Sequence, residues 1–115
     1  MPPTNSPLLM GIDAGTSRVR ALLFELDGTL VAEASDEPTV KCSRPGWAST
    51  EAEDLFKSCL NAIRSVVTMV DKPERVRSVA VASVGEAGVP IDAVGDAVYP
   101  IIAWYDCRTL PQANW

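Results

Sequence analysis

The first turn of the chain carries residues that could bind phosphate. Asp13-Ala14-Gly15-Thr16-Ser17 lies between the apolar run 8–12 and a second apolar run, 19–26. Glycine lets the backbone approach an anion, and the two hydroxyls and the N–H groups of the turn can donate hydrogen bonds to phosphate oxygens. The Asp13 carboxylate can hold Mg²⁺ directly or through a water molecule. The same residues are common in ordinary β-turns, so the motif alone leaves a phosphate site and a structural turn both open.

Two more groups of polar and aromatic residues follow expected strands. Gly85-Glu86 comes after the apolar segment 76–83, and Trp104-Tyr105-Asp106-Cys107-Arg108-Thr109 comes after the apolar segment 98–103. Each group follows an expected strand, so its polar residues are candidate binding residues. Structural alternatives exist for each group, namely a solvated loop acid at Glu86, a local ion pair between Asp106 and Arg108, and a core aromatic at Trp104.

The composition indicates a folded domain and excludes several classes of function. The 115 residues are 47% hydrophobic, with a mean hydropathy of +0.10, which is typical of one domain, or part of one, with a buried core. The net charge of −5 and the pI near 4.6 provide no basic surface for nucleic acid. No segment has the pattern of a signal peptide or a membrane span. We therefore expect a cytoplasmic protein that binds neither nucleic acid nor a membrane.

The side chains available for catalysis are limited. The chain has no histidine, which excludes Ser-His-Asp triads, Cys-His pairs and histidine metal sites within it. Cys42, Cys59 and Cys107 are odd in number and lie far apart, so we expect reduced thiols and neither a disulfide framework nor a zinc site. Any chemistry must rest on carboxylates, hydroxyls and backbone donors.

Three strands are expected in the first part of the chain. The apolar runs 8–12 and 19–26 and the segment 30–35 are predicted to form them, and Asp27-Gly28 between the last two is a strong hairpin signal. The three strands should therefore be antiparallel neighbours. Residues 36–47 contain two prolines and a glycine and show no sustained period, which predicts a connecting loop.

A helix is expected from Thr50 to Val70. Thr50 and Glu53 match a capping box, in which the hydroxyl and the acid satisfy free backbone N–H groups of the first turn. Apolar residues at spacings of three and four then form one face that should cover the sheet: Leu55, Phe56, Cys59, Leu60, Ile63, Val66, Val67 and Val70. Pro73 ends the helix.

Further strands are expected after the helix. Residues 76–83 are predicted to form a buried strand, 87–91 a short one and 98–103 the last one, with a turn at 92–96. The predicted order is therefore βββαβββ, and the fold class is α/β.

In this order, the motifs resemble those of the amino-terminal portion of the FGGY family of carbohydrate kinases, which includes xylulokinase, glycerol kinase and gluconate kinase. Residues 11–17 are similar to the family's first phosphate motif, and a basic residue, Arg20, follows as usual. The segment 45–51, with its Pro-Gly-Trp and its acid, resembles the aromatic-acid segment before the first long helix. Residues 83–86 occupy the place of sugar-contacting polar residues, and residues 104–109 are similar to the family's W-x-D-x-R-T stretch.

The resemblance implies the ribonuclease-H-like, actin-like ATPase fold, here incomplete, with three antiparallel strands, a helix and further strands. It divides the chain into a disordered tail at 1–7, the first part of the kinase amino-terminal domain at 8–109 and a truncated tail at 110–115. The implied activity is ATP-dependent phosphoryl transfer to a hydroxyl of a sugar or polyol, with ATP and Mg²⁺ as cofactors. The family's general base and its adenosine-binding domain would lie beyond residue 115, so the segment alone is expected to be inactive.

The resemblance also implies roles for individual residues. The implied phosphate or nucleotide ligands are Asp13, Gly15, Thr16, Ser17 and Arg20, with Asp13 at the Mg²⁺. The implied substrate ligands are Glu86, Trp104, Asp106 and Arg108. The chain has Gly85 where glycerol kinases have an arginine, and it lacks the Met-His pair of xylulokinases, so the identity of the sugar stays open. The implied partners are this small molecule and the carboxy-terminal part of the kinase, and a homodimer is left open.

Two alternatives compete with this interpretation. Residues 25–31 are similar to the D-x-D-G-T-L-V signature of haloacid-dehalogenase-type phosphatases, whose first aspartate is the nucleophile. Glu25 stands at that position and carries its carboxylate one methylene further out, which would misplace the attack, so we favour a hairpin turn at Asp27-Gly28. The second alternative is a non-catalytic fragment or interaction module of the same fold, and it rests on the short length of the chain.

Overall fold

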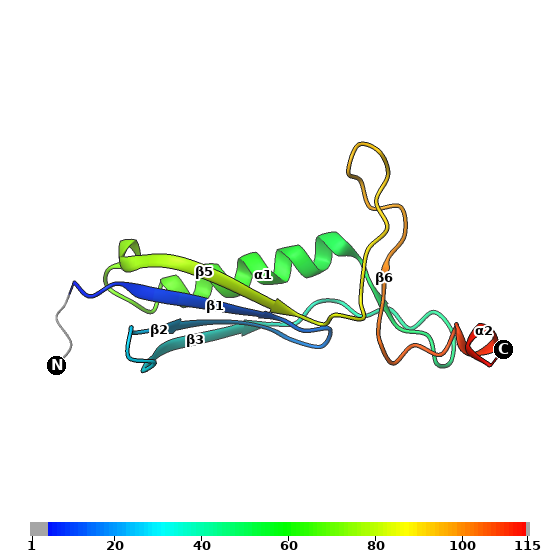
Figure 1. The fold of residues 1–115 in the computed structure, drawn as a ribbon, viewed down its shortest axis with the longest axis horizontal. Helices are drawn as coiled ribbons and strands as arrows, with labels where there is room; N and C mark the ends of the chain where they lie inside the picture. The colour runs from blue at the N-terminus through cyan, green and yellow to red at the C-terminus, as the bar shows by residue number, and fades with distance from the viewer. Residues whose placement is uncertain (1–4, 115) are drawn as a thin grey trace.

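The computed structural model describes residues 5–114, and its main body is a mixed sheet with one helix across one face (Figure 1). The four strands are β1 (Leu8–Ala14), β2 (Val19–Phe24), β3 (Leu30–Asp36) and β5 (Val76–Ser83), in the order β3-β2-β1-β5. β2 is antiparallel to both β1 and β3, as predicted, whereas β5 lies parallel to β1. The carboxyl ends of β1 and β5 therefore meet at one end of the sheet.

The predicted hairpin turn between β2 and β3 is confirmed. Gly28 has a φ of +88°, a value that favours glycine. The N–H of Glu25 donates to the carbonyl of Thr29 at 2.9 Å, and the N–H of Thr29 donates to Oδ1 of Asp27 at 2.9 Å. This second hydrogen bond stabilises the ionised carboxylate and lowers the pKa of Asp27.

Helix α1 (Ala52–Val67) packs mainly over β2 and β3. The largest fully buried side chains of the described core are Leu8, Val19, Leu23 and Val66. Burial of each contributes about 1.5–3 kcal/mol to stability. The predicted apolar face of the helix is correct for Leu55 and Ile63, which pack against this core, and wrong for Phe56, which is 61% exposed.

The predicted start and end of this helix are wrong. Thr50 does not cap it, because Thr50 belongs to a short strand, β4 (Ser49–Thr50), and Glu51 is the N-cap without a side-chain hydrogen bond. The helix ends at Val67 rather than Val70. Pro73, which was expected to stop the helix, instead begins a 3₁₀ turn, η1 (Pro73–Arg75).

Strand β5 forms where it was predicted, but its predicted burial is wrong. Val79 and Val81 are 55% and 66% exposed. They share the helix-side face with Met10 and Ile12, their partners in register on β1. The helix lies over β2 and β3, so within residues 5–114 no element covers β5 or pairs with its outer edge.

The last part of the chain differs most from the prediction. The strand expected at 98–103 is reduced to β6 (Ile101–Ile102), which pairs antiparallel with β4 in a second small sheet. Residues 87–91 do not form a strand, and a single bridge joins Ile91 to Ala97. The turn expected at 92–96 is present, and this segment projects from the body of the molecule (Figure 1).

The ends of the described chain carry further contacts. Residues 1–4 of the predicted disordered tail, and residue 115, lie outside the described residues. Asn5 accepts a hydrogen bond from Lys72 at 2.8 Å, and the carbonyl of Ser6 accepts one from Arg75 at 2.6 Å. A short helix, α2 (Leu110–Ala113), forms in the segment expected to be a truncated tail. None of the helices in residues 5–114 combines the length and the hydropathy needed to cross a membrane.

Candidate functional site

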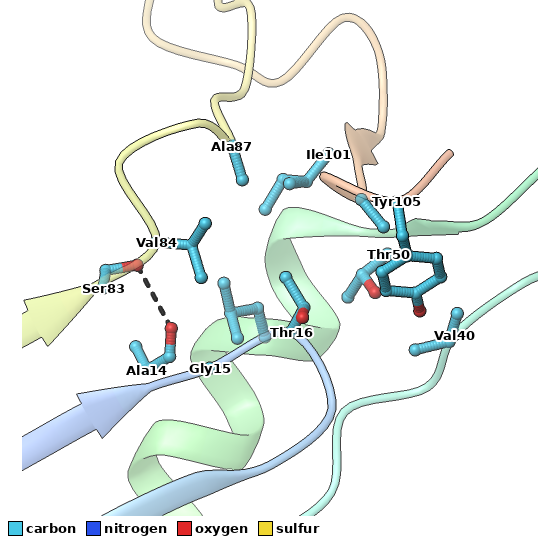
Figure 2. A pocket seen from close by; sticks show the side chains of 12 residues that line it. Ala14, Gly15, Thr16, Val40, Thr50, Ser83, Val84, Ala87, Ile101 and Tyr105 are labelled. Atoms are coloured by element: carbon cyan, nitrogen blue, oxygen red, sulfur yellow. Dashed lines mark hydrogen bonds between the residues drawn. The ribbon is translucent and has the colours of Figure 1, made fainter. Parts of the chain in front are cut away.

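The three polar motifs converge at the end of the sheet where β1 and β5 finish (Figure 2). A small cavity there is lined by residues from the ends of three strands and the chain that follows them: Ala14, Gly15 and Thr16 at the end of β1, Ser83, Val84 and Ala87 at the end of β5, and Ala103 and Tyr105 after β6. Its volume is about 40 Å³, enough for a few water molecules, whereas small-molecule sites span about 300–1,000 Å³. This cavity alone is therefore too small to enclose a typical small-molecule ligand.

The turn after β1 is tight, and its glycine is sterically required. The N–H of Gly15 donates to the carbonyl of Arg18 at 3.1 Å. A Cβ at Gly15 would lie 2.6 Å from that same carbonyl oxygen, which is too close for two non-bonded heavy atoms. The hydroxyl of Ser83 donates to the carbonyl of Ala14 at 3.1 Å (Figure 2). The turn is thus fixed both within itself and to the end of β5.

Asp13 and Arg20 lie on the face of the sheet opposite to the helix. They are partners in register on β1 and β2, so their side chains project to the same side, and both residues are exposed. Arg20 also lies 3.8 Å from the carboxylate of Glu33. The structure therefore places Asp13 and Arg20 next to each other on one face of the sheet, but separates Asp13 from the cavity that Gly15 and Thr16 line.

The arrangement around Asp13 fits a magnesium ion held chiefly by phosphate. Within residues 5–114, no three Asp, Glu, Cys or His side chains lie close enough together to form a metal cage. Mg²⁺ is usually held by one or two carboxylates together with substrate phosphates and several waters. An exposed carboxylate one strand away from Arg20 meets that requirement, with Arg20 available to phosphate oxygens.

Of the predicted site residues, Gly15 and Thr16 line the cavity, and the others lie outside it: Asp13, Ser17, Arg20, Glu86, Trp104, Asp106 and Arg108. Ser17 and Glu86 are exposed, and Trp104 is 62% exposed with its ring edge-on to that of Tyr105, at a centroid distance of 5.4 Å. Tyr105 lines the cavity, and its ring lies beside Thr50 and Val40 (Figure 2). The prediction missed Tyr105 as a site residue, although its position inside the Trp104–Thr109 motif was a signal.

Asp106 and Arg108 form the local ion pair that the sequence left open. Nε and Nη2 of Arg108 donate to the two oxygens of Asp106 at 2.9 and 2.7 Å, and the N–H of Ala48 donates to Oδ2 at 2.6 Å. The side chain of Asp106 is completely buried. The hydrogen bonds from Arg108 hold the pKa of this carboxyl well below its usual range. A direct contact between either residue and a sugar stays a prediction.

The family is shown by comparison with known proteins. Residues 8–114 match the family model of the amino-terminal domain of the FGGY carbohydrate kinases. A glycerol kinase from Bacillus mycoides is 30% identical over 104 residues, which are 89% of this chain and 21% of the relative. The chain thus spans about a fifth of the length of such relatives.

Solved structures agree with this assignment. A kinase from Brucella ovis, described as a xyloylose kinase, matches with a TM-score of 0.88 and 27% identity over 93% of this chain and 23% of its own. Glycerol kinase from Plasmodium falciparum, solved with ADP, matches with a TM-score of 0.80 over 95% of this chain and 22% of its own; its 17% identity supports the fold alone. The sheet and helix are part of the actin-like ATPase fold. The chain belongs to the FGGY family of carbohydrate kinases, as a segment of the amino-terminal domain.

Proposed function

We propose that this chain forms the amino-terminal part of an ATP-dependent kinase that transfers a phosphoryl group to a hydroxyl of a sugar or polyol. The observation that carries the proposal is the convergence of the Gly15 turn, the end of β5 and the segment around Tyr105 at one end of the sheet. In open α/β sheets, ligands bind outside the carboxyl ends of the strands, where these three segments lie. The family is one of carbohydrate kinases, which are enzymes of phosphoryl transfer, and the proposal extends that reaction to this protein.

The phosphate side of the site is assigned to the turn after β1 and to Arg20. Backbone N–H groups and hydroxyls of Thr16 and Ser17 would donate to phosphate oxygens, and Arg20 would offset their charge. Asp13 would hold Mg²⁺, directly or through water, and the metal ion would neutralise charge on the phosphates. In phosphoryl transfer the protein mainly positions the reactants and offsets charge, and this set of groups is suited to both tasks.

The sugar side is assigned to the ends of β5 and β6. Glu86 and Trp104 are exposed at these ends, and Tyr105 already lines the cavity. An acid can accept hydrogen bonds from hydroxyls, and aromatic rings can cover the apolar C–H surface of a sugar. Asp106 and Arg108 act on this side by shaping the chain around Trp104 and Tyr105, because their charged groups already bind one another.

The phosphatase alternative receives no support from the geometry of Glu25. This residue is 8% exposed, and its Oε1 accepts a hydrogen bond from Nη2 of Arg75 at 2.8 Å. It lies just after β2, at the opposite end of the sheet from the cavity. A nucleophilic carboxylate must face its substrate, whereas this one is enclosed in an ion pair.

The proposal is tested with the whole gene product that contains these residues. Purified protein is incubated with Mg·ATP and a panel of glycerol, xylulose, gluconate and other polyols and sugars, and release of ADP is measured. We expect ADP release that depends on at least one member of the panel. Turnover with none of them, or the same rate of ATP hydrolysis with and without acceptor, would contradict the proposal. The 115-residue chain alone is expected to show no turnover, because the proposal assigns it only one part of the site.

A further inference from the structure

The segment 103–108, which we call the aromatic turn because it carries Trp104 and Tyr105, is bound along its length to the loop before β4. The N–H of Ala103 donates to the carbonyl of Ala48 at 2.9 Å, and the N–H of Cys107 donates to the carbonyl of Gly46 at 2.8 Å. Segments more than fifty residues apart in the chain are therefore held in fixed register at the cavity.

The side chain of Trp47 closes this contact by stacking on Arg108. The guanidinium carbon of Arg108 lies 4.2 Å from the centroid of the Trp47 ring, and that of Arg44 lies 4.9 Å from it. Arg108 also binds both oxygens of Asp106 and donates from Nη1 to the hydroxyl of Tyr99 at 3.1 Å. One face of the cation is thus covered by Trp47 while its edge is engaged by hydrogen bonds, an arrangement that fixes its orientation.

The backbone next to Trp47 is adapted to this close approach. Gly46 has a φ of +76°, and a Cβ there would lie 3.3 Å from Cβ of Cys107. A larger residue at this position would be strained and would press the aromatic turn away from the loop. Glycine at 46 and tryptophan at 47 therefore act together, one by permitting the approach and the other by covering the arginine.

We propose that Trp47 is a positioning residue, which acts through Arg108 to hold Trp104 and Tyr105 at the sugar side of the site. Trp47 lines an open groove that Tyr105 also borders, and it is absent from the small cavity at the ends of β1 and β5. Its effect on a ligand in that cavity must therefore pass through the aromatic turn. The assignment of the sugar side rests on the proposed function, whereas the effect of Trp47 on the aromatic turn does not.

The first test measures the aromatic turn without any catalysis. The 115-residue chain is labelled with 5-fluorotryptophan, and the fluorine resonance of Trp104 is assigned by its loss in Trp104→Phe. In Trp47→Leu we expect this resonance to shift or broaden, whereas Trp47→Phe, which retains an aromatic face for Arg108, should leave it close to wild type. The matched control is Phe56→Leu, which trims an exposed aromatic residue on α1. An unchanged Trp104 resonance in a folded Trp47→Leu chain would overturn the proposal.

The second test separates positioning from a merely structural role. In the whole gene product, Trp47→Leu is expected to raise KM for the sugar or polyol about tenfold, because small displacements of binding groups are costly, while KM for ATP stays within about twofold. Trp47→Phe should restore most of the sugar affinity. An equal rise in both KM values, or a lower melting temperature with both KM values unchanged, would contradict the role at the sugar side. If the wild-type protein lacks kinase activity, the proposed function fails, and the fluorine measurement still decides whether Trp47 holds the aromatic turn.

Discussion

Replacing Gly15 with alanine should disrupt the turn after β1, because the added side chain would collide with the backbone of the same turn. The added Cβ would lie 2.6 Å from the carbonyl oxygen of Arg18, whereas ordinary contacts begin at 3.4 Å. The atom it meets is backbone, and the same carbonyl accepts the hydrogen bond from the N–H of Gly15. The turn must therefore open, at a cost of about 1–3 kcal/mol, the range seen when extra atoms are forced into packed sites.

Gly88 provides a matched control for the same substitution. A Cβ at Gly88 meets no heavy atom within 4 Å, and its φ is not in the left-handed region. Gly88→Ala should stabilise the chain by about 0.4–1 kcal/mol, because alanine restricts the unfolded state more than glycine does. The same glycine-to-alanine change is thus predicted to lower the free energy of unfolding at position 15 and to raise it at position 88.

The assay is equilibrium unfolding of the 115-residue chain in urea, followed by circular dichroism. We expect Gly15→Ala to lower the midpoint and Gly88→Ala to raise it slightly, with the m-value unchanged in both. A midpoint for Gly15→Ala at or above that of the wild type would refute the reasoning, because the turn would then accept a side chain. In the whole gene product, Gly15→Ala should also weaken ATP binding, since the displaced N–H groups belong to the proposed phosphate site.

Three further predictions concern the core, the metal and the buried ion pair. Leu23→Ala should lower the free energy of unfolding by about 2–5 kcal/mol because Leu23 is fully enclosed, whereas Phe56→Ala, at an exposed position, should change it by less than about 0.5 kcal/mol. Asp13→Asn in the whole gene product should retain the wild-type melting temperature and lower kcat by about a hundredfold or more; wild-type turnover would exclude Asp13 from the metal site. The low pKa of Asp106 means that its contribution to stability is complete above its ordinary value of 3.8 and is lost as the pH falls below that value towards the folded pKa. In acid titrations followed by fluorescence, Asp106→Asn should therefore be less stable than wild type at pH 7 and should approach it as the pH falls; an equal difference at all pH values would contradict this cause.

The parts of the fold that could be predicted are those decided by residues close together in the chain. Asp27-Gly28 determines the β2–β3 turn through a left-handed glycine and a carboxylate that binds an amide two residues later. The convergence of the three motifs was also predictable in outline, because each follows an expected strand. In contrast, Thr50 fails as a helix cap because its backbone pairs with Ile101, a partner fifty-one residues away that local patterns do not reveal.

In the candidate site too, features set by neighbouring residues were predictable and features set by distant residues were not. Gly15 and Thr16 were predicted and do line the cavity, because they lie within one short turn. Asp13 was grouped with them, yet the alternation of side chains along β1 places it on the other face of the sheet. Tyr105 was missed because its contact with the cavity depends on the pairing of β4 with β6 and on the hydrogen bond from the N–H of Ala48 to Asp106, which are long-range features. The burial of β5 was overestimated because an apolar strand sequence does not say which element covers it.

The central claim is that the turn after β1 binds the phosphates of a nucleotide while the ends of β5 and β6 face the sugar or polyol. The measurement that tests it most directly is a crystal structure of the whole gene product with Mg·ADP and the acceptor that it phosphorylates fastest. We predict a phosphate oxygen within hydrogen-bonding distance of the Gly15–Ser17 turn, the metal ion or one of its waters at the Asp13 carboxylate, and the acceptor in contact with Trp104 or Tyr105. Phosphates bound at the Glu25 end of the sheet, or an acceptor far from both aromatic residues, would contradict the account.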